Sequence, residues 1–104
     1  DVFVCDFFVV SRFRLGNILE TPLDEIVASP KLEEFAQAKS VLGPVCQACP
    51  FIDRCYGGCQ KHRVVLGGEN TDPSYFCRAY KRLYAHAAPV MPDLARRLKE
   101  MGRA

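Results

Sequence analysis

Five of the six cysteines of this 104-residue chain are concentrated in one stretch of its sequence. They are Cys46, Cys49, Cys55, Cys59 and Cys77, separated by two, five, three and seventeen residues. The Cys-x-x-Cys pair that opens the stretch places two sulfurs on one tight turn, which suits a zinc or iron-sulfur site and makes a poor structural disulfide. We therefore expect these cysteines to bind metal and to hold the surrounding loops in place.

The spacing does not choose between zinc and an iron-sulfur cluster, because four thiolates satisfy either centre. The candidate donors for one site are Cys46, Cys49, Cys55 and Cys77. Cys59 could replace one of them. His62, three residues after Cys59, would complete a mixed Cys-His zinc site, but its charged neighbours Lys61 and Arg63 favour a solvated side chain.

Length and charge narrow the class of protein. A chain of 104 residues forms one domain with a large surface for its volume, so bound metal would add to its stability. The formal net charge of +2 gives no reason to invoke nucleic acid. No apolar run is long enough to cross a membrane, and no signal sequence opens the chain. Six thiols without a sign of export favour a reducing compartment, and we expect a cytoplasmic protein.

The N-terminal segment predicts a β-hairpin over residues 1–19. Residues 2–10 are rich in β-branched and aromatic side chains, as in a buried strand, and residues 13–15 can return as a second strand. Because strand character begins directly after Asp1, we expect a piece of a longer protein. Asp6 is unusual here, since a carboxylate among valines and phenylalanines costs free energy unless it is paired, solvated or exposed in a cleft.

Helix signals follow the hairpin. Thr21-Pro22 and Ser29-Pro30 each combine a capping hydroxyl with a proline, and they predict helices that end near Ala28 and before Gly43. Residues 45–77 form the cysteine-rich stretch, in which residues 45–68 have the glycines and prolines of a loop.

Two further helices are expected towards the C-terminus. One starts near Pro73, and a C-terminal helix within residues 89–104 has Leu94, Leu98 and Met101 on one face, which we expect to dock on the body of the protein. The predicted fold class is α+β, a small metal-stapled domain with an N-terminal hairpin, a cysteine-rich loop and several short helices.

Several motifs together resemble a known family. They are Cys5-Asp6-Phe7-Phe8-Val9, Leu15-Gly16-Asn17-Ile18, the run of Cys46, Cys49, Cys55 and Cys59 with Gly57-Gly58 inside it, and finally Cys77. This order resembles the SPASM domain, a twitch-like auxiliary iron-sulfur domain of radical S-adenosylmethionine enzymes. Within that group it is most similar to the C-terminal region of anaerobic sulfatase-maturating enzymes, and the resemblance extends to about Pro92.

The resemblance implies two auxiliary 4Fe-4S clusters. The ligands it assigns to the second cluster are Cys46, Cys49, Cys55 and Cys77. Cys5 and Cys59 match two ligands of the first cluster, whose other two ligands lie upstream in those enzymes, so we expect this site to be incomplete here. Asp6 matches a residue thought to act as the base that removes a proton from the substrate.

The same resemblance limits what the chain can do alone. It lacks the CxxxCxxC loop that binds the S-adenosylmethionine-cleaving cluster, so that cofactor would bind only in a radical SAM catalytic domain of the same, longer chain. We expect an auxiliary, substrate-engaging and electron-transfer domain of an oxidoreductase that converts a Cys or Ser of a sulfatase to formylglycine. The alternatives are the SPASM domain of another peptide maturase, or a stand-alone zinc-binding interaction module. Zinc could also replace iron in the isolated domain.

Overall fold

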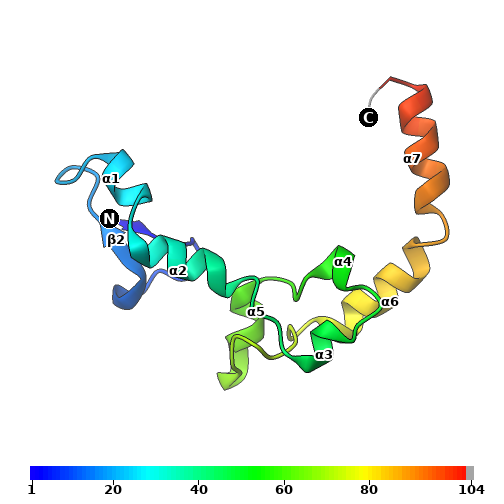
Figure 1. Cartoon of the computed structure of the whole chain (residues 1–104), viewed down its shortest axis with the longest axis horizontal. Coiled ribbons are helices and arrows are strands. Elements are labelled where there is room, and N and C mark those ends of the chain that lie inside the picture. The colour runs from blue at the N-terminus through cyan, green and yellow to red at the C-terminus, as the bar shows by residue number, and fades with distance from the viewer. Residues whose placement is uncertain (103–104) are drawn as a thin grey trace.

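The computed structural model describes residues 1–102 as a set of short helices with one small β-hairpin (Figure 1). The strands are β1 (Val2–Phe3) and β2 (Arg14–Gly16). The α-helices are α1 (Leu23–Val27), α2 (Pro30–Ala38), α3 (Pro44–Gln47), α4 (Ile52–Cys55), α5 (Gln60–Val64), α6 (Cys77–Ala87) and α7 (Met91–Glu100). Two 3-10 turns span Ser11–Phe13 and Val65–Gly67. The last two residues of the predicted C-terminal segment lie outside the described range.

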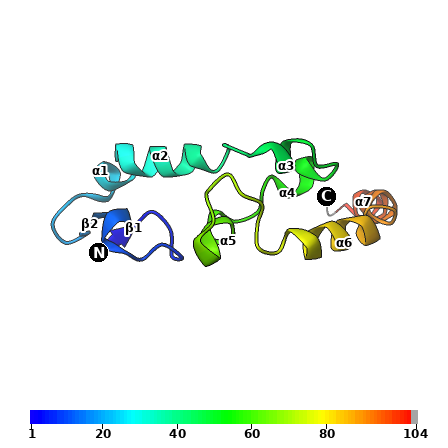
Figure 2. The same cartoon turned by 90° about the horizontal axis from the view of Figure 1, so that it is seen from below.

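The molecule is elongated and has little apolar core. Its extents are 50 × 38 × 18 Å and its radius of gyration is 17.9 Å, whereas a compact domain of this length would have a radius of gyration of about 13 Å. The hairpin, α1 and α2 lie at one end, α5 lies in the middle, and α3, α4 and α6 lie beyond it (Figures 1 and 2). Phe8 and Ile26 are the buried apolar side chains among the described residues. Burial of apolar surface within this chain therefore explains only part of its fold.

The predicted hairpin is present, but its first strand is much shorter than expected. β1 and β2 pair antiparallel with Val2 opposite Gly16, and the strand ends at Phe3. The prediction of one strand through Val10 is wrong, because the chain turns where the amide of Phe8 donates to the carbonyl of Cys5 at 3.0 Å. That turn carries the Phe8 ring inward, where its side chain is buried.

An aromatic cluster joins the hairpin to α2. The rings of Phe8, Phe13 and Phe35 pack edge to face, with centroid distances of 5.0, 5.2 and 5.6 Å. Edge-to-face pairs add to the stability gained from burying the rings. This cluster fixes the position of the Cys5–Phe8 turn relative to the rest of the chain.

The helices α1 and α2 form where the sequence predicts them, but without the expected caps. Neither Thr21 nor Ser29 makes a side-chain capping hydrogen bond, and the N-cap residue of α1 is Pro22. Acidic residues occupy the first turn of both helices, where the helix dipole favours negative charge. α2 ends at Ala38, before the predicted stop at Gly43.

The prediction that residues 45–68 form a loop is wrong in part. This stretch contains α3, α4 and α5, each only four or five residues long. Helices of one turn show no apolar repeat, so periodicity does not reveal them.

The two C-terminal helices also differ from expectation. α6 starts at Cys77 rather than near Pro73. The apolar residues of α7 do not dock on the described chain, because Leu94, Leu98 and Met101 are 48%, 38% and 61% exposed. Figure 1 shows α7 pointing away from the other helices. No helix of the described residues is long and apolar enough to cross a membrane.

A buried arginine organises the turn between α4 and α5. Arg63 is 2% exposed, and its Nε donates to the carbonyl of Gly57 at 2.9 Å. Gly57 has a φ of +76°, and a Cβ there would lie 2.7 Å from both Arg63 Nη2 and Leu42 Cδ2. A glycine is therefore needed at position 57 for both its backbone conformation and its lack of a side chain.

We predict that Phe8→Ala lowers the free energy of unfolding by about 3 kcal/mol, because it empties the centre of the aromatic cluster. Phe7→Ala is the matched control: Phe7 is 59% exposed, so its truncation should cost no more than about 0.5 kcal/mol. Urea unfolding of both variants in the same metal-bound state would measure the difference. Equal losses in the free energy of unfolding would show that the Phe8 ring contributes no more stability than the exposed Phe7 ring.

We also predict that Gly57→Ala destabilises the protein by about 2 kcal/mol more than Gly67→Ala. Gly67 has a φ of +82° with nothing within 4 Å of an added Cβ, so both variants carry the same kind of backbone cost and only Gly57→Ala adds a clash. The measurement is the free energy of unfolding of each variant. A Gly57→Ala protein as stable as Gly67→Ala would contradict the close approach of Arg63.

Candidate metal centre

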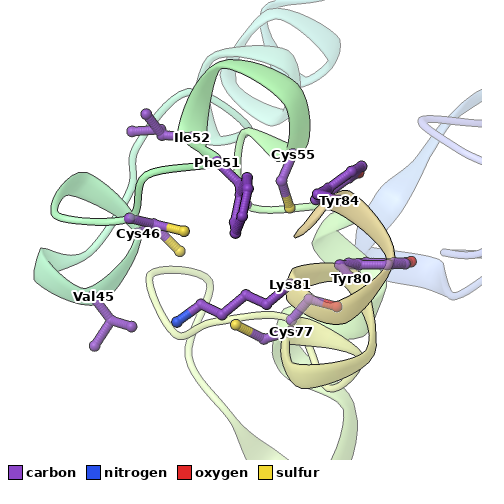
Figure 3. A pocket seen from close by; sticks show the side chains of 12 residues that line it. Val45, Cys46, Phe51, Ile52, Cys55, Cys77, Tyr80, Lys81 and Tyr84 are labelled. Carbon is purple, nitrogen blue, oxygen red and sulfur yellow. The ribbon is translucent and has the colours of Figure 1, made fainter. Parts of the chain in front are cut away.

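Four cysteines from separate segments line one cavity. They are Cys46 of α3, Cys49 just after it, Cys55 at the end of α4, and Cys77 at the start of α6. The cavity is partly open to solvent. In Figure 3 the sulfurs of the labelled Cys46, Cys55 and Cys77 face the same space. The structure thus brings together four of the five clustered cysteines, the set that the family resemblance assigns to one centre.

Local turns explain why these cysteines can converge. The amide of Cys49 donates to the carbonyl of Cys46 at 3.1 Å, and the amide of Ile52 donates to the carbonyl of Cys49 at 3.2 Å. The amide of Cys77 donates to the carbonyl of Ser74 at 2.9 Å. Each of these bonds bends the chain at or beside a cysteine, so the sulfurs are presented from tight backbone turns.

Aromatic side chains form part of the cavity wall. Phe51 and Tyr84 pack with ring centroids 5.9 Å apart, and Tyr80 lies 6.3 Å from Tyr84. Lys81, one helical turn after Cys77, extends across the cavity in Figure 3. The centre therefore combines four sulfur donors with an apolar wall and one nearby cation.

The positions of the sulfurs bear on which metal fits. All six cysteines are free thiols, and within residues 1–102 no three Cys, His, Asp or Glu side chains stand where they could hold a single metal ion. A zinc ion would need all four sulfurs about 2.3 Å from one point. A 4Fe-4S cluster binds each thiolate to a different iron and accepts a wider arrangement. The donor set fits such a cluster.

The electrostatics of the cavity favour a bound cation. Burial raises the pKa of the Cys46 thiol, and the neighbouring Cys77, Cys55 and Cys49 raise it further, while Arg63 lowers it. Several thiolates in one partly dry space repel one another. A metal centre would relieve that repulsion and keep the thiols deprotonated.

Cys5 and Cys59 do not line this cavity, but the segments that carry them meet. The Phe8 ring, three residues after Cys5, lies 5.1 Å from the ammonium nitrogen of Lys61, two residues after Cys59. The Gln60 side chain also donates to the carbonyl of Phe35 at 2.9 Å. The turn after β1 and the start of α5 are therefore neighbours in space.

Asp6 is an exposed carboxylate beside Cys5. The Cys5 thiol donates to its Oδ1 at 3.4 Å, and no ion pair of the described residues includes Asp6. The two nearby arginines are engaged elsewhere: Arg14 pairs with Asp1 at 2.8 Å, and Arg12 lies 4.5 Å from the centroid of the Phe13 ring. The carboxylate is thus open to a ligand or substrate.

The solvated position expected for His62 is wrong. Its imidazole packs edge to face on Phe76 with centroids 4.8 Å apart, and its Nδ1 is buried without a hydrogen-bond partner. The sequence neighbours Lys61 and Arg63 suggested solvent, but α5 directs these adjacent side chains to different sides. His62 is not among the residues that line the cysteine cavity.

Two cations next to the cysteines were missed by the sequence reasoning. Burial lowers the pKa of both Arg63 and Lys39. The nearby Cys55 and Cys59 oppose that shift at both residues. No spacing rule marks either residue, because their partners are backbone carbonyls. The glycine pair at 57 and 58 was the one available signal that the backbone folds closely there.

Comparisons with known proteins agree with the site. Residues 1–50 match the SPASM family of iron-sulfur cluster-binding domains. The cysteine-type anaerobic sulfatase-maturating enzyme of Clostridium perfringens strain 13 is 30% identical over 98 residues, which cover 94% of this chain and 26% of that enzyme. The serine-type enzyme of Bacteroides thetaiotaomicron is 32% identical over 100 residues, with 94% and 24% coverage. The chain thus spans about a quarter of the length of these relatives.

Solved structures give the same relationship. Native anSMEcpe with bound AdoMet and Cp18Cys peptide matches 92% of this chain and 27% of its own chain, with a TM-score of 0.81 and 28% sequence identity. The complex with AdoMet and Kp18Cys peptide has a TM-score of 0.80 over 91% of this chain, also at 28% identity. Sequence and fold together make this chain similar to the matching region of anaerobic sulfatase-maturating enzymes, and its first 50 residues match the SPASM family.

Proposed function

We propose that this chain is the auxiliary iron-sulfur, substrate-engaging and electron-transfer domain of a radical SAM enzyme that oxidises a Cys or Ser of a sulfatase to formylglycine. The observation that carries the proposal is the cavity lined by four free cysteines, in a chain similar to both cysteine-type and serine-type maturases. S-adenosylmethionine would be cleaved in a radical SAM domain of the same protein. Six unpaired thiols favour a cytoplasmic location.

In this proposal a 4Fe-4S cluster is held by Cys46, Cys49, Cys55 and Cys77. These residues come from α3, the turn after it, α4 and α6, so one cluster would staple three helices of the elongated chain together. Metal binding then adds stability that the small apolar core does not supply. Zinc could enter the same cavity in protein purified in air, but its tetrahedral geometry would require the sulfurs to move closer.

Cys5 and Cys59 would bind a second cluster, together with ligands outside this chain. The contact between the Phe8 ring and Lys61 supports this assignment, because it brings the segments of both cysteines side by side. The peptides bound to the similar structures support a peptide substrate for the complete protein.

Asp6 would act as the base. A cluster bound at the adjacent Cys5 would supply a one-electron acceptor next to the carboxylate. Oxidation of the substrate side chain releases a proton as well as an electron, and the exposed Asp6 carboxylate can accept that proton. Its neighbours Arg12 and Arg14 have other partners, so no ion pair must break first.

We predict that Cys46→Ala and Cys5→Ala each remove one auxiliary cluster from the anaerobically reconstituted full-length protein. Iron content and electron paramagnetic resonance (EPR) spectra should show a different cluster lost in each variant. Val45→Ala is the control, since Val45 lines the same cavity without a donor atom, and it should keep its full iron content. Loss of the same spectral component in both cysteine variants, or of none, would contradict the ligand assignment.

We predict that Asp6→Asn in the full-length protein still binds substrate peptide and cleaves S-adenosylmethionine, but forms formylglycine about 100-fold more slowly, because an amide cannot accept the proton. Asp24→Asn, an exposed change on α1, should behave as wild type. Peptide mass spectrometry measures product and chromatography measures cofactor cleavage. Normal turnover in Asp6→Asn would end the assignment of Asp6 as base.

A further inference from the structure

Arg63 is a buried cation without an acidic partner. A buried arginine is usually paired, because an uncompensated charge is costly in a dry environment. No ion pair of the described residues includes Arg63, and its guanidinium instead donates to backbone carbonyls. The acceptors are the carbonyls of Gly57 at 2.9 Å, Lys39 at 3.0 Å, Asn70 and Tyr56 at 3.2 Å, and Gly58 at 3.5 Å.

Lys39 brings a second positive charge to the same carbonyls. Its ammonium donates to the carbonyl of Tyr56 at 3.2 Å and to that of Gly58. All three carbonyls of the turn at residues 56–58 therefore face a cation. Two like charges that share acceptors repel each other, so negative charge nearby would stabilise this arrangement.

The turn at residues 56–58 connects Cys55 to Cys59. In a trans peptide group the C=O and the following N–H point in opposite directions. Because these carbonyls face the two cations, the N–H groups that follow them point away from the cations. Gly57 itself lines the cavity of Cys46, Cys49, Cys55 and Cys77. The cations are thus separated from the cysteine cavity by a single layer of backbone, and α5, which carries Arg63, lies between the two ends of the molecule (Figure 1).

We propose that Arg63 and Lys39 form a fixed positive centre that raises the reduction potential of the iron-sulfur sites at Cys55 and Cys59. This inference rests on the proposed function, in which the cluster at Cys5 and Cys59 accepts one electron from the substrate while Asp6 takes the proton. Accepting an electron makes a cluster more negative, so a nearby cation stabilises the reduced form more than the oxidised form. Both residues act through the sites beside them, as positioning and charge-compensating residues.

The test uses Lys39, which is less buried than Arg63, in the full-length, anaerobically reconstituted protein. Lys39→Met keeps the aliphatic stem and removes the charge, and Lys39→Arg keeps the charge. EPR-monitored redox titration should show a lower midpoint potential for the auxiliary clusters in Lys39→Met, with the reduced form disfavoured about tenfold, or about 59 mV. Lys39→Arg should remain at the wild-type potential. Unchanged potentials in Lys39→Met would overturn the proposal.

Lys31→Met is the matched control. Lys31 is an exposed lysine whose ammonium also donates to a backbone carbonyl, that of Arg14 at 2.9 Å, but it lies on α2 in the hairpin half of the molecule. Its removal should leave the cluster potentials unchanged. A shift as large as that of Lys39→Met would mean that overall protein charge, rather than this positive centre, sets the potentials.

Arg63→Lys separates charge from hydrogen bonding. Lysine cannot reproduce the planar fork that reaches several carbonyls, so the melting temperature should fall while the cluster potentials stay near the wild-type value. A large fall in potential despite the retained charge would contradict the electrostatic role. The iron content and spectra of the wild type are measured first. If no auxiliary cluster assembles, the proposed function fails. If clusters assemble but their midpoint potentials do not change in Lys39→Met, only this inference is refuted.

Discussion

The mutual repulsion of cysteine thiolates in a shared cavity is the constraint on which this structure depends. Burial and the neighbouring cysteines raise the pKa of Cys46, and a bound cation would favour its thiolate form. Helices of one turn and short loops suffice to position these cysteines because a metal centre, once bound, fixes them from within. The fold positions the cysteine donors, and the metal centre that they would bind supplies the remaining stability.

The rest of the chain accordingly shows little of the packing expected of a domain of this length. Phe8 and Ile26 are its buried apolar side chains, and cohesion between segments depends on the aromatic cluster near the hairpin and on the hydrogen bonds of Arg63. Such contacts hold neighbouring segments, but they do not enclose a core.

The sequence predicted those features that leave a pattern. Cysteine spacing grouped five cysteines, and the family resemblance assigned Cys46, Cys49, Cys55 and Cys77 to one centre; these four line one cavity. The hairpin follows from β-branched and aromatic residues, and the helices near residues 23, 30 and 91 follow from proline signals and helical spacing, whereas α6 begins later than predicted. The strand expected through residue 10 failed because burying the Phe8 ring requires a turn that β propensity cannot reveal. Arg63 was missed because its partners are backbone carbonyls, which every residue has, so no complementary side chain in the sequence points to it.

The turn at residues 56–58 explains how two nearby cysteines come to face different surroundings. Cys55 and Cys59 are four residues apart, so a continuous helix would put them on one face. Instead Tyr56, Gly57 and Gly58 have φ values of 46°, 76° and 63°, which end α4 after Cys55 and make Cys59 the N-cap residue of α5. A left-handed tyrosine costs about 1 kcal/mol, and the bonds from Arg63 and Lys39 to this turn offset that cost. The separation of Cys55 and Cys59 therefore depends on the side chains of Arg63 and Lys39.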